Sequence, residues 1–141
     1  MSNKISINHQ TTFVHNHNKY KMAFHNDLGK EGEQIGIDFL IKKGYKILAT
    51  NWRHRQEEID IIAMDGPELV IIEVKTRTSS FFETPEMAVT RSKQKFLIHA
   101  AAAYIRQYRL EQETRFDILS IIKNTKYHQV THIENAFYPG I

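Results

Sequence analysis

Two apolar runs of this sequence carry charged residues whose types and spacing could act on a phosphate ester. Residues 69–75, LVIIEVK, hold Glu73 and Lys75 two positions apart, so a β-strand would present both side chains on one face. Residues 58–62, EIDII, hold Asp60 in the middle of a second run. If the two runs pair as neighbouring strands, Asp60 comes within reach of Glu73, to within one register step.

Two carboxylates at that range favour a divalent cation between them. Like charges so close repel and raise one pKa unless a cation compensates them. Because only oxygen ligands are offered, we expect Mg²⁺ or Mn²⁺ rather than Zn²⁺. The metal would polarise a phosphodiester and activate a water, while Lys75 would either orient that water or stabilise charge in the transition state. The sequence leaves both roles of the lysine open.

A third acid, Glu33, lies on the apolar stripe of a predicted helix, which it shares with Ile37, Leu40 and Ile41. A carboxylate that faces a sheet needs a partner, and a metal, a lysine or a metal-bound water would each satisfy it. We therefore predict that Glu33 joins the other two acids around the cation.

Two other interpretations of the acids stay open. Glu73 and Lys75 could form an ordinary ion pair at a strand end, with Asp60 as a solvated edge residue. The chain would then be a catalytically silent nucleic-acid-binding module, or a scaffold whose acids only stabilise the core.

The elements that must position these residues follow from periodicity and turn signals. Helical spacing predicts helices over 30–43, with Gly44 as a C-terminal cap, and over 85–108. β-branched and aromatic runs predict strands over 45–52, 58–64, 69–77, 114–123 and 130–137. Short turns suggest that the first three strands form an antiparallel meander, and the long second helix permits a parallel crossover to the fourth. We therefore predict an α/β fold in which a mixed sheet is flanked by helices.

Length and charge indicate one domain with a polar extension. The chain has 141 residues, 19 basic and 16 acidic, and residues 1–21 contain three lysines and no acid. Residues 22–141 are therefore neutral, and we predict that they form the single domain and that 1–21 is a disordered extension or a DNA-contacting arm. There is no cysteine, which excludes disulfides and Cys-ligated zinc. No stretch resembles a secretory signal or a membrane span, so we expect a cytoplasmic protein without membrane contacts.

Basic residues flank the acids in sequence and could bind phosphates, or could be ordinary solvated charges. Trp52 fits a core position better than a base-stacking platform, and Asp117 fits either a structural cap or a support for the site. The predicted nucleic-acid contacts are Arg53, Arg55, Arg77, Arg91, Lys93 and Lys95.

Short motifs spread over residues 30–139 resemble the YraN family of bacterial endonuclease-like proteins. They are Gly-Glu at 32–33, GYKIL at 44–48, NWR at 51–53, EID at 58–60, EVKTR at 73–77, AVT at 88–90, RFD at 115–117 and IENAF at 133–137. One departure is Glu57, where the family has glycine.

This resemblance implies a PD-(D/E)XK restriction-endonuclease-like fold with an α-β-β-β-α-β core, related to archaeal Holliday junction resolvases. It implies catalytic roles for Glu33, Asp60, Glu73 and Lys75. We expect a metal-dependent nuclease acting on branched, flapped or otherwise structured DNA. A homodimer would suit an enzyme that cuts junctions, although no self-complementary face is visible in the sequence.

Overall fold

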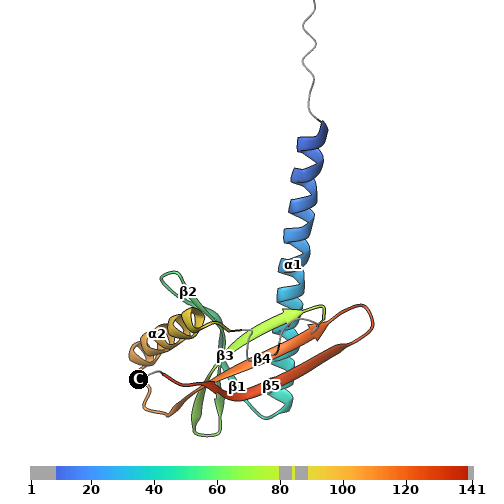
Figure 1. The fold of residues 1–141 in the computed structure, drawn as a ribbon. Coiled ribbons are helices and arrows are strands. Elements are labelled where there is room, and N and C mark those ends of the chain that lie inside the picture. The colour runs from blue at the N-terminus through green and yellow to red at the C-terminus, as the bar shows by residue number, and fades with distance from the viewer. Residues whose placement is uncertain (1–8, 80–83, 85–88, 140–141) are drawn as a thin grey trace, which may run out of the picture.

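The computed structural model of the chain describes residues 9–79, 84 and 89–139, which form two helices and one five-stranded sheet (Figure 1). In chain order the elements are α1 (His9–Lys42), β1 (Lys46–His54), β2 (Glu57–Asp65), β3 (Glu68–Arg77), α2 (Arg91–Tyr108), β4 (Thr114–Lys123) and β5 (His128–Phe137). The predicted mixed α/β fold is confirmed, and each predicted strand is present to within two residues at either end. Within the described ranges, neither helix is long and apolar enough to cross a bilayer.

The sheet has the order β1-β2-β3-β4-β5. The first three strands form the predicted antiparallel meander. The β3–β4 pair is parallel, with Glu73 opposite Ile118, because α2 carries the chain back across the sheet, and β5 then pairs with β4 in the antiparallel sense. The predicted crossover is therefore also confirmed.

The two helices cover opposite faces of the sheet. Along β3, Leu69 and Ile71 pack with the buried residues of α2, whereas Val70 and Ile72 pack beside Leu40 of α1. Alternate residues of one strand thus enter two separate cores, which is why 69–74 is a nearly continuous apolar run. Figure 1 also shows that α1 continues well beyond the sheet.

Helix α1 meets the sheet through small residues as well as apolar ones. Gly32 and Gly36 are buried with Leu40, whereas Ile41 is 55% exposed, so the predicted placement of Ile41 on the inner stripe is wrong. The helix lies so close to the strands that a Cβ on Gly32 would overlap the side chain of Thr76 in β3. Only glycine permits that approach, so the buried face of α1 runs through Gly32, Gly36 and Leu40 and leaves Ile41 outside it.

The helix boundaries differ from the predicted ones in two places. α1 begins at His9 rather than residue 30, inside the predicted extension, and the division of the chain at residue 21 stays a prediction. α2 begins at Arg91, because the Thr90 hydroxyl accepts a hydrogen bond from the Lys93 amide at 3.2 Å and caps the helix there. The predicted start at residue 85 lies outside the described residues. At the end of α1, Gly44 has φ +95° and caps the helix as predicted.

Candidate nuclease site

A break in the pairing of β2 with β3 positions the first acid. The paired residues run from Asp65 and Glu68 to Ile61 and Ile72 and stop there. One residue further, the Asp60 carboxylate accepts a hydrogen bond from the Val74 amide at 2.8 Å. A side-chain oxygen thus takes the place of a main-chain partner, and the strands separate at this point.

The same break makes the alternation of side chains along β2 irregular. Ile59 packs in the α2-side core with Ile62, whereas Ile61 packs in the α1-side core, so Ile59 and Ile61 do not share a face as a regular strand would require. Opposite the break on β1, Asn51 has φ +50°, a conformation that asparagine tolerates better than most residues. The irregularity therefore affects both strands that flank Asp60.

Asp60 and Glu73 lie against each other, as predicted. Glu73 is buried with 5% of its side chain exposed, and Asp60 is partly buried. Burial, and then the charge of Glu73, raise the pKa of Asp60 to about 7. Burial likewise raises the pKa of Glu73, although Lys93 and Lys75 partly offset it. Both carboxyl groups therefore resist ionisation, because the positive charge near them does not balance two adjacent negative charges.

Two lysines approach this pair from different elements. The ammonium groups of Lys75, on β3, and Lys93, on α2, lie 3.8 Å and 3.7 Å from the Glu73 Oε1 atom. The other oxygen, Oε2, is buried and has no hydrogen-bond partner among the described residues. The Asp60 carboxyl could supply a donor to it only by carrying a proton. The pair therefore needs either a shared proton or a cation.

Glu33 lies on the α1 side of this pair. Burial raises its pKa, a hydrogen bond with Asn51 lowers it, and the charges of Asp60 and Glu58 raise it further. No three Asp, Glu, His or Cys side chains within the described ranges gather as metal ligands do. Of the three acids predicted to meet, Asp60 and Glu73 lie together, and a ligand role for Glu33 stays a prediction.

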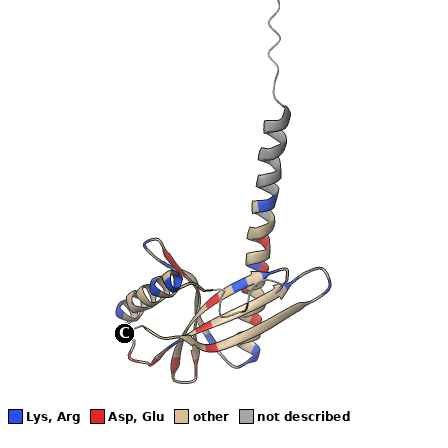
Figure 2. Cartoon of the chain, in the orientation of Figure 1, with Lys and Arg blue, Asp and Glu red and all other residues tan. Residues whose placement is uncertain are grey.

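The residues predicted to contact DNA lie on different elements of the domain. Arg53 is bonded to Glu58 at 2.8 Å, and Arg55 lies in the β1–β2 turn. Arg91 and Lys95 line a hollow between α2 and the segment that follows β5, and its described lining contains no acid. Figure 2 shows basic residues at both ends of this helix. Arg77 ends β3, two residues beyond Lys75.

The roles of Trp52 and Asp117, which the sequence left open, are both in the packing of the domain. Trp52 packs against the α2-side core, where its ring meets Tyr104 edge to face at 5.2 Å. Asp117 is fully buried and accepts hydrogen bonds from Arg115 at 3.0 Å and from the Asn135 amide at 3.1 Å, and it lies 2.7 Å from His132. Burial alone would raise the pKa of Asp117, but these contacts outweigh it and lower the pKa.

The position of Lys93 beside Glu73 was not predicted. Lys93 was grouped with the DNA contacts, because a helix that starts at residue 85 does not place this lysine in its first turn. The usable signal was Thr90, since a capping threonine places the third residue after it in the first turn, facing the strand end. The exposed Phe96 one turn later was also missed.

Comparison with known proteins identifies relatives along most of the chain. Residues 32–121 match the model of the uncharacterised protein family UPF0102. A UPF0102 protein of Flavobacterium psychrophilum is 48% identical over 83% of this chain and 98% of its own length. Others from Parabacteroides distasonis and Phocaeicola vulgatus are 44% and 43% identical over 83% and 85% of this chain, and 97% and 99% of their own lengths.

Proposed function

The chain belongs to the UPF0102 family, and from the paired acids described above we propose that it is a metal-dependent nuclease of the PD-(D/E)XK type. It would hydrolyse phosphodiester bonds of branched or structured DNA in the cytoplasm. The single observation that carries this proposal is the buried carboxylate of Glu73, which faces Asp60, has two lysines beside one oxygen and has no described partner for the other.

The residues present fit a small divalent cation. Asp60 and Glu73 would hold Mg²⁺ or Mn²⁺, since both metals prefer oxygen ligands and Mg²⁺ is commonly bound by one or two carboxylates together with water and phosphate. The unpartnered Glu73 oxygen and the raised pKa of both acids support this assignment, because a cation would satisfy the first and reverse the second. When bound, the metal would supply Lewis-acid polarisation of the phosphate and a more acidic water.

The two lysines supply fixed positive charge next to the acids. About a third of each side chain is exposed, 37% for Lys75 and 36% for Lys93, so both ammonium groups can meet a bound phosphate. Lys75 would orient the attacking water or stabilise charge that develops on the phosphoryl oxygens. Lys93 would hold the same phosphate from the side of α2, and the Glu73 carboxylate fixes the direction of both side chains.

Further phosphates of the DNA would contact α2 beside the segment that follows β5. Arg91 and Lys95 line one hollow there, and no described residue of its lining is acidic. Such contacts bind the backbone without regard to base sequence and weaken as salt rises. Binding of structured DNA is thus compatible with a domain that has no large net charge.

Cleavage of a synthetic four-way junction or flap in Mg²⁺ tests the proposal. We expect wild-type protein to cut and EDTA to abolish cutting. Asp60→Ala should also abolish it, because only one acid of the pair remains. The control is Asp38→Asn, which changes an exposed acid of α1 whose contact is a hydrogen bond from Gln34.

Two results would contradict the proposal. If the wild type binds the junction but never cuts it, the chain is a silent binding module. If Asp60→Ala cuts as the wild type does, the acids are structural and the cutting activity lies elsewhere.

A further inference from the structure

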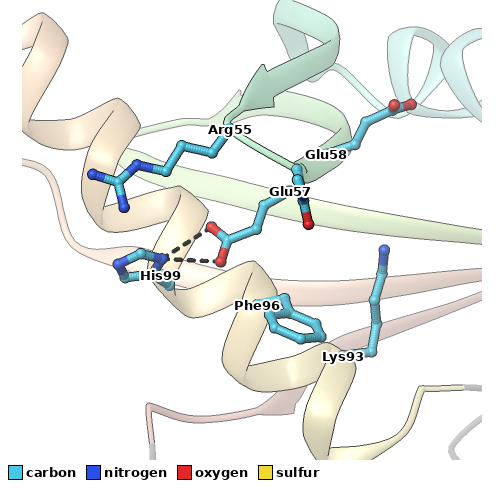
Figure 3. Close-up of a pocket in the computed structure, with 7 residues that line it drawn as sticks. Arg55, Glu57, Glu58, Lys93, Phe96 and His99 are labelled. Carbon is cyan, nitrogen blue, oxygen red and sulfur yellow. Dashed lines mark hydrogen bonds and ion pairs between the residues drawn. The ribbon is translucent and has the colours of Figure 1, made fainter.

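A cleft of about 540 Å³ lies between the β1–β2 turn and the first turns of α2 (Figure 3). Arg55 of the turn and Glu57 and Glu58 at the start of β2 line it on one side, and Lys93, Phe96 and His99 line it from the helix. Its size falls within the range of about 300 to 1,000 Å³ that small-molecule sites occupy.

The cleft adjoins the proposed nuclease site through one side chain. Lys93 lines the cleft, and its ammonium nitrogen lies 3.7 Å from the Glu73 carboxylate. A molecule in the cleft would therefore lie next to a phosphate held at the acid pair.

The two acids of the cleft are already paired. Both oxygens of Glu57 lie 3.0 Å from His99 Nδ1, and Glu58 is bonded to Arg53 at 2.8 Å. By contrast, Arg55 forms no ion pair with any acid in the part of the chain that the structure describes. The Arg55 guanidinium group and the aromatic ring of the cleft are therefore available to meet a ligand.

That ring belongs to Phe96, which is 55% exposed although the next residue, Leu97, is fully buried in the core. Figure 3 shows the Phe96 side chain on the cleft side of α2, between Glu57 and Lys93. An exposed aromatic face beside cationic groups matches how proteins hold an unpaired base, because every base can stack on a ring while its phosphate meets a cation.

We propose that this cleft receives an unpaired nucleobase next to the scissile phosphodiester, with Phe96 stacked on the base and Arg55 at the adjoining phosphate. The inference rests on the nuclease function proposed above and names its substrate class. That class is DNA with an unpaired nucleotide at the cleavage position, such as a flap or the single-stranded arm of a branch. A base inside a duplex is stacked on both faces, so continuous duplex would not enter.

Binding of a short single strand that carries 2-aminopurine tests this in EDTA, where cleavage cannot consume the probe. Stacking on Phe96 should quench the fluorescence of 2-aminopurine, and the wild type should bind the single strand more tightly than the blunt duplex formed by the same strand and its complement. Phe96→Ala should weaken single-strand binding by at least about fivefold and remove the quenching. Phe96→Trp should retain both.

Tyr127→Ala is the matched control, because Tyr127 is an aromatic residue with the same 55% exposure in the β4–β5 turn. It should bind as the wild type does. The inference fails if Phe96→Ala keeps wild-type affinity and quenching, or if the wild type binds the blunt duplex as tightly as the single strand. It also fails if Phe96→Ala alters only self-association, since the cleft would then be a protein interface.

The two proposals can fail separately. Quenching by a wild type that never cuts in Mg²⁺ would overturn the nuclease function and leave base binding in place. Cleavage of duplex and flap alike, unchanged by Phe96→Ala, would overturn the cleft assignment alone.

Discussion

Gly32→Ala should destabilise the protein, although an exchange of glycine for alanine at an exposed helix position usually stabilises a helix. A Cβ at position 32 would lie 2.6 Å and 2.7 Å from the Cγ2 and Cβ atoms of Thr76 and would also overlap its hydroxyl. The Thr76 Cβ atom is fixed to the strand backbone and does not move when the side chain rotates, so α1 must move off β3. Overpacking of this kind typically costs about 1 to 3 kcal/mol, and the better helix propensity of alanine offsets about 1 kcal/mol of it.

Gly29 provides the matched comparison three residues earlier in the same helix. A Cβ there would have no atom within 4 Å, so Gly29→Ala should stabilise the fold by up to about 1 kcal/mol. Urea denaturation of the two variants should therefore give free energies of unfolding that change in opposite directions.

Thr76→Ala tests whether the contact itself causes the loss. In the Gly32→Ala background it removes the overlapping hydroxyl and methyl groups, so the double variant should recover part of the stability. Equal effects of Gly29→Ala and Gly32→Ala, or a double variant in which the two losses simply add, would refute the close approach of α1 to β3.

Three other changes have expected outcomes. In EDTA, Asp60→Asn should flatten the pH dependence of stability. Folding raises the pKa of Asp60 from 3.8 to about 7, so the wild type should lose at most about 4 kcal/mol of stability as the pH rises from about 4 through 7. Urea titrations of both proteins near pH 4.5 and pH 8 measure this loss. Asp117→Ala should cost about 1 to 3 kcal/mol in the same assay, because Arg115 loses a buried hydrogen-bond partner while Asp65 and Glu68 still pair with it. Arg91→Ala and Lys95→Ala should each lower the slope of log affinity for DNA against log salt by about 1, measured by fluorescence anisotropy.

Much of the architecture was predictable because local signals agreed with the fold. Alternation and turn residues located the strands, and the turn at 65–67 set the pairing that brings Asp60 to Glu73. The family resemblance is confirmed at the level of UPF0102.

The details of the site were not predictable, because they depend on contacts between distant segments. Nothing local in β2 indicates that Val74 donates to a side chain and interrupts the strand pairing. The inner face of α1 is set by how closely Gly32 meets Thr76, which apolar periodicity cannot show. Lys93 reaches Glu73 only because α2 starts at the Thr90 cap and packs on the sheet beside β2.

Calorimetric titration of Mg²⁺ and Mn²⁺ into the protein without DNA is the most direct test of the central claim, because it needs no assumption about substrate. We expect saturable binding to the wild type and to Asp38→Asn, and none to Asp60→Ala or Glu73→Gln, since each of these two variants loses one charged ligand. Unchanged metal binding by Asp60→Ala and Glu73→Gln, or no binding by the wild type, would show that these acids do not form a cation site.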